Sequence, residues 1–119
     1  MTKHNFKELI VWQKARKLAV DVYKAVKNFP EDEKYALTSQ IKRSVISISS
    51  NIAEGAGRNT DKDFAHFLDI ALGSSNELES QIIIATDLEF ISKNDIKDVY
   101  NLIVEVQKLI YGFQKKIRE

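Results

Sequence analysis

A chain of 119 residues has the length of one domain, and the absence of cysteine excludes disulfides, thiolate metal ligands and a cysteine nucleophile. Apolar residues make up 44% of the chain and charged residues 29%, but four glycines and one proline provide few of the turns that a many-stranded fold needs. The net charge of +1 is unevenly distributed: residues 1–59 carry 11 Lys and Arg against 6 Asp and Glu, and residues 60–119 carry 7 against 11.

Apolar residues at steps of three and four predict a first helix over residues 6–28. They are Val11, Ala15, Leu18, Val22, Val26 and Phe29. Pro30 and the acidic residues after it mark a loop and the start of a second helix, expected over residues 33–54. The apolar side of this helix consists of Leu37, Ile41, Val45, Ile48 and Ile52. We expect it to end at Gly55-Ala56-Gly57, because glycine readily adopts the left-handed backbone of a helix C-terminus.

A third helix is predicted over residues 61–88, because Thr60 and Asp63 have the spacing of a capping box. Its apolar side consists of Phe64, Phe67, Leu68, Ala71, Leu72, Ser75, Leu78, Ile82 and Ala85. This helix is long for a small domain, at roughly 40 Å for a rise of about 1.5 Å per residue.

A fourth helix is predicted over residues 95–117, after a second capping pattern at Ser92 and Asp95. Its apolar residues alternate steps of three and four, as in a coiled coil, and are Ile96, Val99, Ile103, Val106, Ile110, Phe113 and Ile117. Four helices with short connections and one apolar side each predict an all-α fold. We expect an up-down-up-down antiparallel four-helix bundle, formed as a single domain by residues 1–119.

The sequence carries no targeting or membrane signal. Residues 1–5 lack the apolar stretch of a signal peptide, and no run of about 18 apolar residues is present to span a bilayer. We therefore expect a cytoplasmic protein with no membrane partner.

Candidate catalytic and metal-binding patterns are weak. Asp63 and His66 have the carboxylate-x-x-His spacing of di-iron bundles, but no second copy occurs, and His4 is expected in a frayed N-terminus. The serines at positions 44, 47, 49 and 50 have no evident base partner, and residues 55–58 lack the strand and the Gly-Lys-Ser/Thr ending of a phosphate loop. We predict no enzymatic activity, no cofactor and no metal site.

A candidate oligomer interface lies beside the main apolar stripes. On the second helix it consists of small or apolar residues, namely Ser39, Ile46, Ser50 and Ala53. Trp12 and Tyr23 lie on a second side of the first helix, and aromatic residues are favoured at interfaces. Gly73 lies in the middle of the predicted third helix, where glycine is less favourable than alanine, and close packing is one explanation for it. Packing within the chain and contact with another subunit remain two open interpretations of the small residues.

A candidate nucleic-acid surface follows from the basic first half of the chain. Lysines at positions 14, 17, 24 and 27 are spaced to share a helical side, and further cations follow on the second helix. The predicted contacts are Lys14, Lys17, Lys42, Arg43 and Arg58. No base-reading motif is present, so we expect contacts to the phosphate backbone and binding that weakens with salt.

Several stretches of the sequence carry a family resemblance along nearly the whole chain. They are residues 6–15, 29–30, 37–44, 47–55 with Arg58, and 67–75 followed by Glu77-Leu78-Glu79; the most specific run is Ser50-Asn51-Ile52-Ala53-Glu54-Gly55. The sequence resembles the four-helix bundle proteins encoded in intervening sequences of bacterial 23S rRNA genes, which are sometimes labelled ribosomal proteins.

The resemblance implies a compact bundle that assembles into a ring, a homopentamer, without known enzymatic activity. A related branch, the accessory protein of diversity-generating retroelements, binds nucleic acid and a reverse transcriptase through a strongly basic surface. This chain is less basic, so the resemblance carries over only the cationic positions Lys42, Arg43 and Arg58. Our hypothesis is a non-catalytic oligomeric scaffold that binds structured RNA or an RNA–protein complex. The alternative is a protein-interaction module for a reverse transcriptase or another partner, without direct contact to nucleic acid.

Overall fold

The structure is a computed structural model that describes residues 4–118, so Met1, Thr2, Lys3 and Glu119 of the predicted domain lie outside the described residues. Its long helices are α1 (Ile10–Ala25), α2 (Leu37–Ala56), α3 (Asp61–Asp87) and α4 (Lys93–Arg118). Short 3₁₀ helices span Phe6–Glu8, Val26–Asn28 and Glu31–Glu33. Residues 4–118 contain no β-strand.

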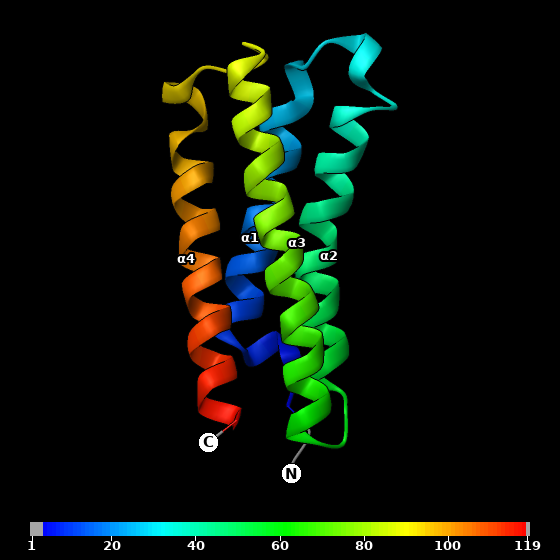
Figure 1. The fold of residues 1–119 in the computed structure, drawn as a ribbon, viewed down its shortest axis with the longest axis vertical. Coiled ribbons are helices and arrows are strands. Elements are labelled where there is room, and N and C mark those ends of the chain that lie inside the picture. The colour runs from blue at the N-terminus through cyan, green and yellow to red at the C-terminus, as the bar shows by residue number, and fades with distance from the viewer. Residues whose placement is uncertain (1–3, 119) are drawn as a thin grey trace.

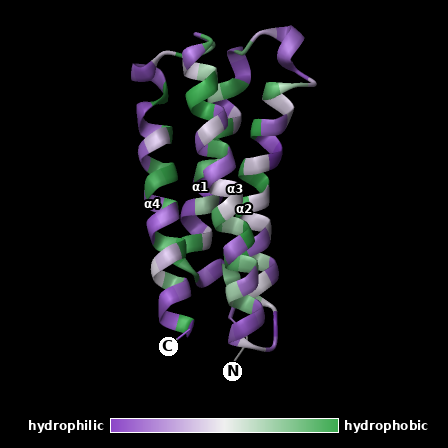
Figure 2. Cartoon of the chain, in the orientation of Figure 1, coloured by the Kyte–Doolittle hydropathy of each residue, from purple (hydrophilic) through white to green (hydrophobic). Residues whose placement is uncertain are grey.

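The helices form an antiparallel bundle with extents of 46 × 24 × 20 Å (Figure 1). Each helix contacts the next along the chain, and α4 contacts α1, which closes the bundle into a square. Figure 2 shows hydrophobic and hydrophilic residues alternating along each helix, as expected where one side of each helix is buried. The predicted all-α, up-down-up-down bundle is confirmed.

The predicted apolar stripes form the core. Its largest fully buried side chains are Leu18, Val22, Ile41, Val45, Ile48, Ile52, Phe64, Leu68, Leu78, Ile82, Ile103 and Ile110. All of them were expected at core positions from their spacing in the sequence, because a helix that repeats apolar residues every three or four positions can bury them only along one side. No helix within residues 4–118 is both long enough and apolar enough to cross a membrane.

The first two helices begin later than the sequence predicts. The chain enters α1 through the 3₁₀ helix Phe6–Glu8 and an extended Leu9, with φ −78° and ψ 125°, so α1 begins at Ile10 rather than at residue 6. Before α2, residues 31–33 form the third 3₁₀ helix, and the Glu33 carboxylate accepts a hydrogen bond from the Leu37 backbone N–H at 3.3 Å. This bond satisfies one of the free N–H groups at the start of α2 and places that start at Leu37 rather than at residue 33.

The two predicted caps are confirmed. The Thr60 hydroxyl accepts from the Asp63 backbone N–H at 3.1 Å, and the Ser92 hydroxyl accepts from the Asp95 N–H at 3.0 Å. The second of these caps starts α4 at Lys93, two residues before the expected position.

The helix α2 ends at the predicted glycine-containing segment, but not through a left-handed glycine. Gly57 caps the helix with φ −87°, so no glycine here adopts the left-handed backbone. Gly55 is required for another reason: a Cβ added there would lie 2.8 Å from both Phe64 and Phe67. Glycine therefore lets the start of α3 pack directly against the end of α2.

Small polar residues line the rest of the α2–α3 contact. The Ser47 and Ser74 hydroxyls lie 2.8 Å apart, and the buried Ser44 hydroxyl donates to the Gln81 side chain at 3.0 Å. Packing within the chain therefore accounts for these serines and for Gly55. It does not account for Gly73, because a Cβ added at this position would meet nothing within 4 Å.

Candidate functional site

Cations lie over aromatic rings on the side of the bundle formed by α1 and α2. The Lys42 ammonium lies 5.1 Å from the centre of the Tyr23 ring, and the Arg16 guanidinium lies 5.6 Å from that of Trp12. Tyr23 is 43% exposed, whereas Trp12 is half-buried and packs edge-on against Phe6 at 4.9 Å. Two residues predicted at an oligomer interface thus form part of a surface that carries positive charge on aromatic faces.

The predicted interface residues of α2 lie on its solvent-facing side. Ile46 is 43% exposed, Ser39 and Ser50 are exposed, and Ala53 is half-buried. On α1, Val20 is 49% exposed. The side of α2 with Ile46 is separate from the side that packs on α3, and Ile46, Ser39 and Ser50 stay exposed on it within residues 4–118.

Three of the predicted nucleic-acid contacts form ion pairs within the chain. Lys14 pairs with Glu105 of α4 at 3.3 Å. Lys17 pairs with Asp21 at 2.7 Å, and this hydrogen bond, reinforced by the negative charge of the carboxylate, raises the pKa of Lys17.

Arg58 is also paired within the chain. It binds Glu54 at 2.9 Å, and its guanidinium lies 4.6 Å from the centre of the Phe67 ring. Such exposed pairs are weak, at about 0–1 kcal/mol, so a phosphate competes with them easily.

The five predicted cations do not converge on one patch. Lys14 and Lys17 lie on the side of α1 toward α4, Lys42 lies beside α1, and Arg58 lies at the end of α2. Arg43 is exposed and lines a shallow depression of about 240 Å³ between α2 and α3, together with Gln40, Ser44, Ser47 and Glu77. The structure therefore brings Lys42 together with the aromatic surface and distributes the other cations around the bundle.

A polar network that the sequence did not reveal links α3 and α4. The Tyr100 hydroxyl donates to the Glu79 carboxylate at 2.5 Å, and the Gln107 amide donates to Glu79 at 2.8 Å and to Asn76 at 3.1 Å. The hydrogen bond from Tyr100, followed by that from Gln107, lowers the pKa of Glu79. The same bond raises the pKa of Tyr100. Pairs this far apart in sequence have no signature in helical periodicity.

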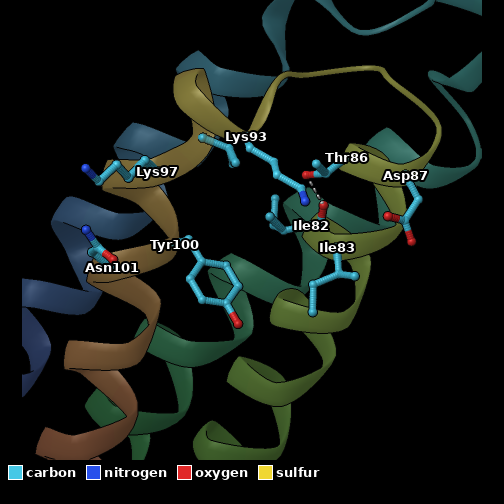
Figure 3. Close-up of a pocket in the computed structure, with 9 residues that line it drawn as sticks. Ile82, Ile83, Thr86, Asp87, Lys93, Lys97, Tyr100 and Asn101 are labelled. Carbon is cyan, nitrogen blue, oxygen red and sulfur yellow. Dashed lines mark hydrogen bonds between the residues drawn. The ribbon is translucent and has the colours of Figure 1, made fainter.

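A groove of about 370 Å³ opens between α3 and α4 next to this network (Figure 3). Its residues are Ile82, Ile83, Thr86, Asp87, Lys93, Ile96, Lys97, Tyr100 and Asn101. The buried Ile82 and Ile96 contribute to an apolar floor, and Figure 3 shows the Lys93 side chain reaching across the groove toward Ile82 and Thr86. This volume is in the range of small-molecule and side-chain pockets. No pattern in the sequence indicates the groove.

The histidines differ in their surroundings. His66 is exposed, 5.5 Å from the Phe67 ring. His4 packs against Phe64 at 5.2 Å and Phe113 at 5.8 Å, and its backbone N–H donates to the Ala56 carbonyl at 3.1 Å. The expectation of a frayed N-terminus at His4 is therefore wrong, because an aromatic contact and a backbone hydrogen bond hold this residue against the bundle.

Catalysis or metal binding would need polar side chains that converge within residues 4–118. No three His, Asp or Glu side chains there lie together in an arrangement that would hold a metal ion. Ser44 is hydrogen-bonded to Gln81 and Ser49 to the Ile46 carbonyl, so neither contacts a general base. The surfaces with a defined geometry are the cation–aromatic side and the α3–α4 groove, both of which suit binding.

This architecture defines a four-helix bundle protein whose distinctive features lie on its outer surfaces. The chain belongs to the 23S rRNA-intervening sequence protein family, whose model matches residues 7–112. It is similar to a crystal structure of a protein with unknown function from the S23 ribosomal protein family of Bacteroides thetaiotaomicron VPI-5482. The TM-score is 0.83, the sequence identity is 29%, and the match covers 89% of this chain and 99% of that chain. No curated protein matches this sequence.

The family resemblance seen in the sequence is thus confirmed. The link to the accessory protein of diversity-generating retroelements, the pentamer and the binding of nucleic acid stay predictions.

Proposed function

We propose that this protein is a non-catalytic homo-oligomeric scaffold, with five copies as the expected number, that binds structured RNA or an RNA–protein complex. The observation that carries the proposal is the α1–α2 side of the bundle, where Lys42 and Arg16 lie over the rings of Tyr23 and Trp12. A surface of this kind offers ammonium and guanidinium groups to phosphates, and aromatic faces to unstacked bases.

The family context supports RNA as the anionic partner, because the family takes its name from sequences that interrupt 23S rRNA genes. One copy places only Lys42 and Arg16 over aromatic rings on this side, so affinity would come from repeating the surface in an assembly. Binding of this type is dominated by counterion release and therefore falls steeply with salt.

Uncovered apolar side chains support the assembly of several copies. Ile46 and Val20 are 43% and 49% exposed, and Gly73 presents open space on α3. A second copy that covered these residues would remove apolar surface from water at about 25 cal/mol per Å².

RNA binding is tested by fluorescence anisotropy with a labelled hairpin fragment of 23S rRNA. The expected result is micromolar or tighter binding near 50 mM salt that weakens by at least roughly tenfold near 200 mM salt. Lys42→Ala combined with Arg43→Ala should weaken it further, whereas Lys115→Ala with Lys116→Ala, at the other end of the chain, is the matched control. Absence of binding at low salt, or an affinity that does not change with salt concentration, would reject RNA as the ligand.

Assembly is tested with Ile46→Glu, which places a charge on the solvent-facing side of α2 without altering the buried stripe. Light scattering should show a fall in particle mass, while circular dichroism shows unchanged helicity. Retention of the parent mass would show that this side of α2 is not the subunit contact.

A second candidate function is a protein-interaction module that does not touch nucleic acid. It is favoured by the intrachain ion pairs of Lys14, Lys17 and Arg58, which occupy three of the predicted contacts. A partner that the protein retains from nuclease-treated lysate, and that survives Lys42→Ala with Arg43→Ala, would support this candidate over the RNA scaffold.

A further inference from the structure

The loop before α2 displays an aromatic side chain that nothing within residues 4–118 covers. Tyr35 is 88% exposed, the highest value among the large hydrophobic residues described as exposed. The neighbouring Lys34 ammonium lies 5.5 Å from the centre of its ring, and Glu31 and Asp32 are exposed just before it. The loop thus presents a tyrosine flanked by two carboxylates and one ammonium.

The groove between α3 and α4 has the opposite character. Its floor includes Ile82 and Ile96, which are 1% and 4% exposed, and Ile83 on its wall is 46% exposed. Its charged residues are Lys93 and Lys97 on α4 and Asp87 on α3. These three charges, like Glu31, Asp32 and Lys34 of the loop, form no ion pair within residues 4–118.

We propose that the Tyr35 loop of one copy docks into the α3–α4 groove of a second copy. The tyrosine ring would lie on the isoleucine floor, Glu31 and Asp32 would face Lys93 and Lys97, and Lys34 would face Asp87. This inference rests on the homo-oligomer of the proposed function and identifies one of its contacts. The loop offers two exposed carboxylates and one ammonium, with its third carboxylate, Glu33, half-buried and bonded to the Leu37 N–H. The groove offers two positive charges and one negative, and this complementarity selects one partner surface over others.

The placement of the two surfaces suits contact between copies in a ring. Figure 1 shows the loop and the groove at the same end of the bundle, the end opposite the two termini. The loop joins α1 to α2, whereas the groove lies between α3 and α4, so the two occupy opposite sides of the square of helices. Rotation about an axis parallel to the bundle keeps both at one level, and a head-to-tail contact between different surfaces closes into a ring.

Tyrosine is well suited to such a contact. A buried tyrosine contributes a large apolar area, loses few rotamers, and keeps its hydroxyl available for a hydrogen bond. The groove supplies polar partners at its edge, including the Asn101 side chain.

Site-directed disulfide formation tests the contact directly, because the natural chain has no cysteine. One preparation carries Tyr35→Cys and a mass-tagged second preparation carries Ile83→Cys. Each chain then has a single thiol, so any disulfide that joins positions 35 and 83 is between copies. After mixing and mild oxidation, mass spectrometry should find the mixed dimer as the dominant product. In the matched control, Tyr111→Cys replaces Tyr35→Cys: Tyr111 is 64% exposed and belongs to the C-terminal third of α4. Figure 1 shows the C-terminus at the end of the bundle opposite the α1–α2 loop.

Charge reversal tests the electrostatic part. Lys93→Glu with Lys97→Glu should raise the dissociation constant of the assembly by at least roughly tenfold, and adding Glu31→Lys with Asp32→Lys should restore it. Sedimentation equilibrium measures both, and circular dichroism confirms that the helices persist. A monomeric natural chain at high concentration would overturn the proposed assembly and this contact together. An oligomeric chain that shows neither the mixed dimer nor the charge-reversal effect would overturn this contact alone.

Discussion

The two sides of α3 meet their neighbours in different ways. Toward α2, the side chains at the contact are small: Gly55 admits Phe64 and Phe67, and Ser47 meets Ser74 at 2.8 Å. Toward α4, long polar side chains span the gap, with Tyr100 bonded to Glu79 and Gln107 to Asn76.

The difference accounts for the unequal open space on the two sides of α3. Small residues bring the helix backbones close together, so the facing sides of α2 and α3 are buried against each other. Long side chains hold α4 farther from α3, and the space beside them remains open as the groove lined by Ile82, Ile83 and Lys93. Close packing therefore leaves little open space on one side of the helix, and the bridged gap leaves a groove of about 370 Å³ on the other.

The largest effect on the free energy of unfolding is expected from truncating a core side chain, compared with truncating one in the wall of the groove. Ile48 is fully buried, so Ile48→Ala should lower the free energy of unfolding by about 2–5 kcal/mol. Ile83 lies in the groove wall and is 46% exposed, so Ile83→Ala should cost less than about 1 kcal/mol in the monomer. Urea denaturation measures both. Equal losses for the two variants would mean that the groove wall is as important to the fold as the core is.

The next effect concerns the tightest point of the α2–α3 contact. Gly55→Ala would place a methyl group 2.8 Å from two phenylalanine side chains and should destabilise the fold by about 1–3 kcal/mol. Gly57→Ala is the control, since its added Cβ would meet only the Glu54 carbonyl at 3.6 Å. Thermal unfolding followed by circular dichroism compares the two, and a neutral Gly55→Ala would refute close approach as the reason for glycine there.

Helical periodicity was sufficient to predict the bundle. The core stripes and the caps at Thr60 and Ser92 follow from spacings of three and four residues, because each depends on contacts within one helix or on a repeated side of it. The starts of α1 and α2 were misplaced, since 3₁₀ turns at Phe6–Glu8 and Glu31–Glu33 satisfy the same local preferences as an α-helical turn.

The candidate surfaces were less accessible to sequence reasoning. The exposure of Ile46 follows from its position on α2, but the partners of Lys14 and Lys42 lie on other helices. The packing of His4 against Phe64 depends on where two remote segments meet, and so does the groove beside Tyr100. Residue spacing along one helix contains no information about these contacts.

A smaller effect is expected from removing the hydrogen bond that spans the α3–α4 gap. Tyr100→Phe should slightly lower the free energy of unfolding at neutral pH, because Glu79 loses its strongest donor. The folded-state pKa of Glu79 lies below its ordinary value of about 4.3, so this stabilisation is present above that value and is lost as the pH falls through the folded pKa.

The same stabilisation also has an alkaline limit, where it is lost as the pH rises. The folded-state pKa of Tyr100 lies above its ordinary value of about 10, so its contribution is complete below that value and is lost as the pH rises through the folded pKa. Urea unfolding of parent and variant between these limits should give a constant difference that shrinks at both ends. A difference that does not vary with pH would mean that packing of the ring, rather than the hydrogen bond to Glu79, accounts for it.

The smallest effect is expected at Gly73, which belongs to neither contact of α3. An added Cβ there meets nothing within 4 Å, so Gly73→Ala should raise the stability of the monomer by about 0.5–1 kcal/mol through helix propensity alone. Gly112→Ala in α4 is the matched control, because its Cβ also has open space. If Gly73 faces another subunit, Gly73→Ala should weaken assembly in sedimentation equilibrium while stabilising the monomer, and Gly112→Ala should change stability only. If both variants stabilise the monomer and neither changes assembly, Gly73 lies on a free surface. Its lack of a side chain would then have no role in assembly.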